Sequence, residues 1–183
     1  MIASVLAVAS LVTFVAVAVS VASHSSGQLG KQSSVQLIPI APGRQHASTR
    51  ATLKRLGGGS PVTVGGATGA PMVVNFFASW CPACKRELGA MAAVARTGGV
   101  RFVGVDTDDN APGLALSLLR RAGARYAVGI GGASLVEAYG TANLPTTAFV
   151  NGRGKIVALA LGALTRHDLS RWVAELAAGK PLS

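Results

Sequence analysis

The sequence predicts a mixed α/β domain in which helices cover both faces of a central sheet. Its middle part alternates short apolar runs, typical of strands buried on both faces, with helical stretches rich in alanine and leucine. Its last third reads strand, turn, strand and helix, which predicts an antiparallel hairpin beside a parallel core. The sequence contains no internal repeat, and no glycine-rich phosphate loop joins a strand to a helix.

The individual elements follow in order along the chain. Residues 51–56 and 61–64 flank Gly57-Gly58-Gly59-Ser60, which predicts a hairpin. The later expected strands are 71–77, 100–105, 126–130, 146–150 and 156–161. The expected helices are 84–96, 114–122, 134–139 and 165–178. Ser134 is expected to cap the third helix, and Thr165 with Asp168 three residues later resembles a capping box at the start of the fourth.

The N-terminal segment is predicted to be a membrane anchor or a signal peptide. The 21 residues from Ile2 to Ala22 carry no charge, and a helix of that length spans about 30 Å, the thickness of a bilayer core. This length, and the absence of a basic residue before it, favour an uncleaved anchor over a cleaved signal. Ser20-Val21-Ala22 offers small residues for cleavage, so a secreted protein is the alternative.

Three segments are therefore expected: the anchor or signal peptide at 1–22, a flexible linker at 23–49, and one domain at 50–183. Within the linker, Val35–Ile38 is compatible with a short strand. The first basic residues after the apolar segment, from Lys31 on, favour a cytoplasmic position for that side of the membrane. That preference conflicts with the extracytoplasmic position of the domain that is inferred below.

The two cysteines, Cys81 and Cys84, stand three residues apart where a predicted strand gives way to a helix. A disulfide that closes so short a loop stabilises a fold by about 2 kcal/mol, and a chain of this length folds without one, which disfavours a structural staple. A zinc site needs four ligands, and none of the 3 histidines is spaced near the pair. A copper carrier also lacks a nearby His or Met pattern. A redox-active disulfide is favoured, with no metal and no cofactor.

The position of the pair predicts different roles for its two thiols. Cys81 would stand at the first turn of the helix, where unpaired backbone N–H groups and the helix dipole favour the thiolate. Pro82 suits this turn because no N–H is needed there. Cys84 lies one turn deeper. We therefore expect Cys81 to form a mixed disulfide with a partner and Cys84 to release that partner.

A second feature is the run Leu144–Val150, in which Pro145 precedes a strand of β-branched residues. The proline is either an ordinary junction between loop and strand or a cis proline that faces the disulfide.

The segment Asn75–Cys84 (NFFASWCPAC) resembles the active-site segment of thioredoxin-like proteins, in particular the TlpA/ResA group of membrane-tethered thiol–disulfide oxidoreductases. Residues 138–147 resemble the cis-proline loop of that group. The resemblance covers residues 51–178 and implies a thioredoxin-like fold.

The resemblance also implies roles for individual residues. Cys81 would be the exposed nucleophile and Cys84 the resolving thiol. Pro145 would be cis and lie beside the disulfide, and Trp80 would shape the contact surface, so these two are the expected substrate-binding residues. Cytoplasmic thioredoxins carry a buried carboxylate six residues before the first cysteine, where this chain has Asn75. Because an amide cannot accept a proton, water or another residue must do so.

The charge of the chain limits its partners. It has 17 Lys and Arg against 7 Asp and Glu, a net charge of +10. Arg120, Arg121 and Arg125 cluster, but no aromatic side chains interleave with them, so no nucleic-acid partner is expected. A basic surface suits anionic lipids or envelope polymers, or serves only solubility.

Taken together, these features predict a monomeric, single-pass membrane protein whose extracytoplasmic domain reduces disulfides through Cys81 and Cys84. The expected partners are thiols and disulfides of envelope proteins, including apocytochrome c before haem attachment, and a membrane electron donor. An oxidase of the same fold and a non-catalytic module that carries copper are the alternatives.

Overall fold

The computed structural model describes residues 35–107, 110–140 and 142–183, which belong to one folded unit. The predicted anchor at 1–22 lies outside the described residues, as does the first part of the predicted linker, residues 23–34. Within the described part of the chain, no helix has the length and apolarity needed to cross a membrane.

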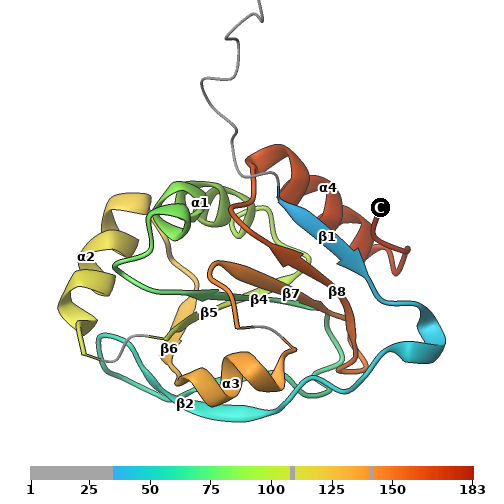
Figure 1. The fold of residues 1–183 in the computed structure, drawn as a ribbon, viewed down its shortest axis with the longest axis horizontal. Coiled ribbons are helices and arrows are strands. Elements are labelled where there is room, and N and C mark those ends of the chain that lie inside the picture. Colours follow the sequence, from blue (N-terminus) through green and yellow to red (C-terminus); the bar gives the residue numbers. More distant parts are fainter. Residues whose placement is uncertain (1–34, 108–109, 141) are drawn as a thin grey trace, which may run out of the picture. The chain divides into compact units, whose positions relative to one another are not determined.

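A parallel core of three strands forms the centre of the sheet (Figure 1). All six residues of β4 (Met72–Phe77) are buried, as the continuous apolar run predicts. β5 (Arg101–Asp106) pairs parallel with β4, and β6 (Ala127–Ile130) pairs parallel with β5. Parallel neighbours need crossover connections, which α1 (Pro82–Val94) and α2 (Pro112–Ala122) provide.

Antiparallel strands flank this core on both sides. β7 (Thr146–Val150) pairs with β4 and with β8 (Ile156–Leu161), which confirms the predicted C-terminal hairpin. β2 (Ala51–Arg55) and β3 (Val62–Val64) form the other predicted hairpin, and β2 joins the sheet beside β6.

The folded unit begins before the predicted boundary at residue 50. The short strand that the sequence allowed near residues 35–38 is present as β1 (Gln36–Pro39) and pairs antiparallel with β8. A 3-10 turn, η1 (Pro42–Arg44), follows it, and buried Ser48 donates a hydrogen bond to the Gly154 carbonyl oxygen at 2.9 Å. So short a strand has little periodicity of its own, and its pairing with an existing sheet edge stabilises it. The strand order is β1-β8-β7-β4-β5-β6-β2-β3.

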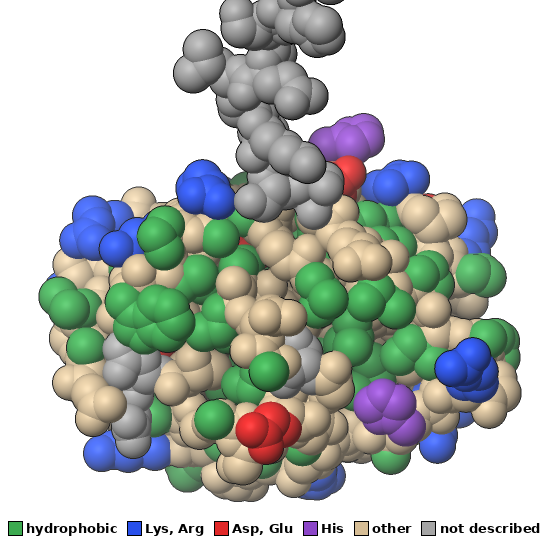
Figure 2. Space-filling view, viewed as in Figure 1, with side chains coloured by type: hydrophobic (Ala, Val, Ile, Leu, Met, Phe, Trp, Pro, Cys, Tyr) green, Lys and Arg blue, Asp and Glu red, His purple; other side chains and the backbone are tan. Residues whose placement is uncertain are grey.

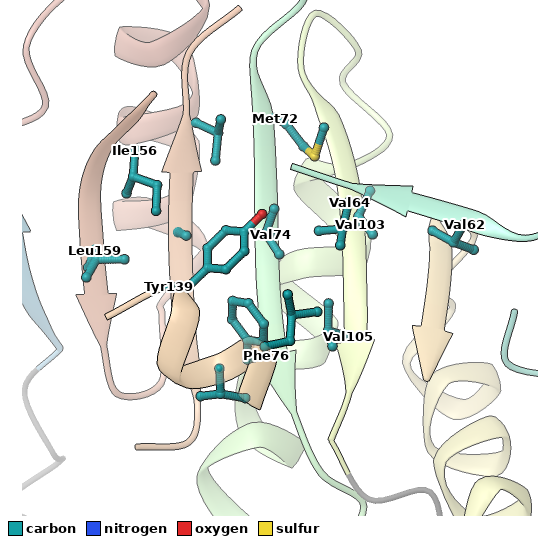
Figure 3. Close-up of a cluster of buried hydrophobic side chains, with 14 residues drawn as sticks. Val62, Val64, Met72, Val74, Phe76, Val103, Val105, Tyr139, Ile156 and Leu159 are labelled. Atoms are coloured by element: carbon teal, nitrogen blue, oxygen red, sulfur yellow. The ribbon is translucent and has the colours of Figure 1, made fainter. Parts of the chain in front are cut away.

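Helices lie on both faces of the sheet, as predicted (Figure 1). α1, α2 and α4 (Arg166–Ala177) cover one face, and α3 (Ala133–Ala138) lies on the other. Side chains alternate along β4 between these two layers. Phe76 packs edge to face on Tyr139 on the α3 side, with ring centroids 5.0 Å apart (Figure 3). Phe77 points to the α1 side, where the cysteines lie.

Helix α4 begins at a side-chain cap, whereas α3 does not. The Asp168 N–H donates to Thr165 Oγ1 at 3.2 Å, and the Thr165 hydroxyl donates to the Asp168 carboxylate at 2.7 Å. The predicted cap at Ser134 is wrong, because α3 starts from Gly132 in extended backbone and has no side-chain cap. Ser134 therefore lies inside the first turn.

These two helix starts provide a direct test of the capping argument. Thr165→Ala is expected to lower the free energy of unfolding by about 1 kcal/mol, because a first-turn N–H loses its acceptor. Ser134→Ala, the matched control, is expected to change it by less than about 0.5 kcal/mol. Urea denaturation of the two variants measures both values, and equal losses would contradict the assignment.

Candidate functional site

Cys81 and Cys84 form a disulfide at the N-terminus of α1, with their Cα atoms 5.3 Å apart. Cys81 is the N-cap and Pro82 the first helical residue, as the sequence predicts. The Cys84 backbone N–H donates to Cys81 Sγ at 3.1 Å. When the disulfide is open, this donor and the dipole of a helix of 13 residues both stabilise negative charge on the Cys81 sulfur. The geometry therefore favours the thiolate at Cys81.

The pair is packed into an apolar cluster beneath α1 and α2. This disulfide cluster consists of Leu56, Phe77, Ala78, Cys81, Cys84, Leu88, Ala115, Leu118, Leu119 and Val128. Cys81 is only 4% exposed and Cys84 is fully buried. The predicted exposure of Cys81 is therefore wrong for the disulfide form, although Cys81 remains the more accessible of the two. Trp80 beside it is 63% exposed and presents a large apolar side chain to solvent.

The peptide bond between Leu144 and Pro145 is cis, as the resemblance predicts. Thr146 pairs with Phe76 in the antiparallel register of β7 and β4. This register places Pro145 at the end of β4 from which the chain leads to Cys81. Leu144 packs against the disulfide cluster, so the structure brings the proline loop and the cysteine pair to the same end of the sheet.

Glu87 is a buried carboxyl near the pair that the sequence analysis did not identify. It lies three residues after Cys84 on α1, so both side chains share one face of the helix. Asn75 Nδ2 donates to Glu87 Oε1 at 2.8 Å, and the Leu164 N–H donates to Oε2 at 3.1 Å. Burial raises the pKa of Glu87 to about 7, while these two hydrogen bonds oppose the rise. Such a group can accept or release a proton at neutral pH.

Asn75 stands where cytoplasmic thioredoxins carry a buried carboxylate, and its side chain holds the Glu87 carboxyl in place. Its side chain is buried, and Nδ2 also donates to Thr147 Oγ1 at 3.1 Å. The network thus joins β4, α1 and β7. One signal could have revealed Glu87: it is the single acidic residue of the predicted helix 84–96, on the same face as Cys84. Glutamates are usually solvated, so the pattern alone does not indicate burial.

Among the charged side chains on the visible face, basic ones predominate. Figure 2 shows Lys and Arg around the edge of the domain and few acidic side chains on that face. Two of the described carboxyl groups, those of Glu87 and Asp106, are buried. Burial of these acids makes the exposed surface more basic than the composition alone suggests.

The chain is similar to known proteins in sequence and in fold. The family model described as Redoxin matches residues 43–176. The thiol:disulfide interchange protein DsbE of Allochromatium vinosum is 41% identical over 58 residues, which is 32% of each protein. The thiol-disulfide oxidoreductase ResA of Halalkalibacterium halodurans is 30% identical over 110 residues, 57% of this chain and 61% of that protein. The chain thus covers less than two thirds of the length of these relatives.

A solved structure agrees with these matches. The crystal structure of a secreted Mycobacterium tuberculosis disulfide oxidoreductase, described as homologous to E. coli DsbE, superposes with a TM-score of 0.62 and 25% identity. The superposition covers 69% of this chain and 96% of that one. The fold is therefore thioredoxin-like, as predicted. The Redoxin match spans most of the folded unit and includes the cysteine pair and the proline loop, so this chain belongs to the Redoxin family.

Proposed function

We propose that the domain is a thiol–disulfide oxidoreductase that reduces disulfides in envelope proteins. The observation that carries this proposal is the hydrogen bond from the Cys84 N–H to Cys81 Sγ at the start of α1. It prepares Cys81 to act as a thiolate. The relatives named as thiol–disulfide oxidoreductase and interchange proteins support the proposal.

The proposed reaction starts from the reduced protein. The Cys81 thiolate attacks one sulfur of the partner disulfide, so the partner S–S bond breaks, a Cys81–partner bond forms, and the other partner sulfur leaves as a thiolate and takes up a proton. Cys84 then loses its proton and attacks Cys81 Sγ. The Cys81–Cys84 disulfide forms, and the second partner thiolate leaves and is protonated. Two electrons pass from the protein dithiol to the partner.

Glu87 is the proposed proton acceptor for Cys84. Cys84 is fully buried and must be deprotonated before it attacks. Asn75 cannot accept this proton, whereas the carboxylate that Asn75 holds can. The pKa of Glu87, raised by burial to about 7, lies between those of an ordinary carboxyl and an ordinary thiol.

The partner polypeptide is proposed to bind at Trp80 and Pro145. The exposed Trp80 offers an apolar surface beside Cys81, and aromatic side chains of this kind contribute much of the binding energy at protein interfaces. Pro145 lies at the same end of the sheet and would contact the backbone of the bound segment.

The cellular setting of this reaction is also a proposal. The uncharged segment at 2–22 supports a single-pass anchor that holds the domain outside the cytoplasm, with secretion after cleavage as the alternative. A monomer with an oxidised Cys81–Cys84 pair would then need a membrane electron donor to be reduced again. Proteins that bind haem through cysteine thiols, such as apocytochrome c, are the proposed clients.

The reduction potential of the pair tests the direction of the reaction. Equilibration with glutathione buffers, followed by alkylation of free thiols, is expected to give a value well below about −200 mV, as in reducing members of the fold. A value near or above about −120 mV marks a strong oxidant and would overturn the reductase assignment in favour of an oxidase.

A further inference from the structure

Tyr126, which directly precedes β6, places a buried hydroxyl on the α1 side of the sheet. Its ring packs against the disulfide cluster and over Gly104 of β5. A Cβ atom at Gly104 would lie 3.2 Å from Tyr126 Cε2, so this glycine leaves room for the ring. The hydroxyl at the end of the ring has no hydrogen-bond partner among the described residues.

A second polar atom without a partner lies on the same side of the sheet. Gly104 is the register partner of Asn75 in the adjacent strand, and paired residues direct their side chains to the same face. The amide nitrogen of Asn75 is bound to Glu87 and Thr147. Its Oδ1 is buried and has no hydrogen-bond partner within residues 35–107, 110–140 and 142–183. Buried polar atoms are nearly always bonded to protein or to water.

The other groups around Glu87 do not supply this missing contact. β7 and the loop before α4 contribute the neutral Thr147 hydroxyl and the Leu164 N–H. Asp106 is a buried carboxyl on the same face of β5 and has contacts of its own. Asp168 and Glu175 of α4 are half-buried and bonded to Thr165 and Ser183. The basic side chains of the surrounding helices are exposed, and none of those described forms an ion pair with Glu87. They are Lys85, Arg86, Arg120, Arg121, Arg166, His167 and Arg171.

The Tyr126 ring lies over Gly104, which is paired with Asn75, and Asn75 binds Glu87, so the hydroxyl and the carboxyl belong to the same side of the sheet. The pKa of Tyr126 is raised, first by burial and then by the negative charge of Glu87. The hydroxyl therefore stays protonated over the whole working pH range and can act as a donor. The Cys81–Cys84 disulfide is uncharged in this form, and Glu87 is bonded directly to Asn75, one of the two residues that carry an atom without a partner.

We propose that Tyr126 is a positioning residue for the proton on Glu87. Its hydroxyl donates to one buried water, and this water donates to Asn75 Oδ1 and to the Glu87 carboxylate. Three polar partners are typical of a buried water. The contact favours the carboxylate and so limits the rise in the pKa of Glu87 that burial causes. The importance of this contact for turnover rests on the proposed function, but the contact itself does not.

The test is an NMR titration of the oxidised protein, which needs no turnover. The sequence has three glutamates, Glu87, Glu137 and Glu175, so ¹³C labelling of glutamate side chains gives three carboxyl signals, and Glu87→Gln identifies one of them. Tyr126→Phe keeps the ring and removes only the hydroxyl. It is expected to raise the midpoint of the Glu87 titration by about one pH unit.

The second tyrosine provides the matched control. The Tyr139 hydroxyl donates to the Thr49 carbonyl oxygen at 3.0 Å on the α3 side of the sheet. Tyr139→Phe is therefore expected to lower stability without moving the Glu87 midpoint. An unchanged or lowered midpoint in Tyr126→Phe, or equal shifts in the two variants, would overturn the assignment. Either outcome leaves the proposed redox activity untouched, because that activity is tested separately at Cys81.

Discussion

Cys81→Ser is expected to reduce the rate of insulin disulfide reduction to that of dithiothreitol alone. The hydroxyl of serine is not ionised at neutral pH and cannot form a disulfide, so the first bond to the partner never forms. The reaction is followed by the turbidity of precipitating insulin chains. This is the largest expected effect, since the whole cycle passes through the sulfur that accepts the Cys84 N–H.

Cys84→Ser separates attack from release and serves as the companion variant. It keeps Cys81 as the helix N-cap but removes the buried thiol that resolves the mixed disulfide. It is expected to accumulate a mixed disulfide with the partner protein. Dithiothreitol reduces this bond and releases the partner, which mass spectrometry then identifies. Unchanged insulin reduction by Cys81→Ser would refute the mechanism. Tight binding of Cu(I) by the reduced protein without any turnover would favour the copper carrier.

The second large effect concerns the pH dependence of stability. The pKa of folded Glu87 is raised to about 7 by burial, against a value of 4.5 for an unperturbed glutamate. Between these two pH values the unfolded chain has lost this proton and the folded chain still holds it, so stability falls as pH rises. The loss begins near pH 4.5, is complete above about pH 7 and amounts to about 3 kcal/mol.

Urea unfolding of the oxidised protein at several pH values measures this dependence. Glu87→Gln keeps a side chain of similar size and removes the titrating group, so the fall in stability across this range is expected to disappear. Glu137, which is exposed on α3, provides the control, since Glu137→Gln should follow the wild-type curve. Parallel curves for the wild type and Glu87→Gln would show that Glu87 does not titrate as proposed.

Much of the fold could be predicted because its signals are local. The expected strands and helices of the domain are present, since continuous apolar runs, glycine-rich turns and the cap at Thr165 act within a few residues. The resemblance supplied the cis Leu144–Pro145 bond. Ser134 and β1 show the limit of local signals. A serine near a helix start need not be its cap, and a strand of four residues depends on the edge with which it pairs.

For the candidate site, the chemistry could be predicted from the two cysteines and their position. Two cysteines at a strand–helix junction lie at a helix N-terminus whatever surrounds them, and that position favours a thiolate at Cys81. The burial of the pair and the identity of the groups around it depend on how distant segments pack together. Asn75 and Glu87 meet because β4 and α1 pack together, and Tyr126 joins the same face because Gly104 leaves room for its ring. Burial and the pKa of a carboxyl depend on neighbours far away in sequence, which no local pattern records.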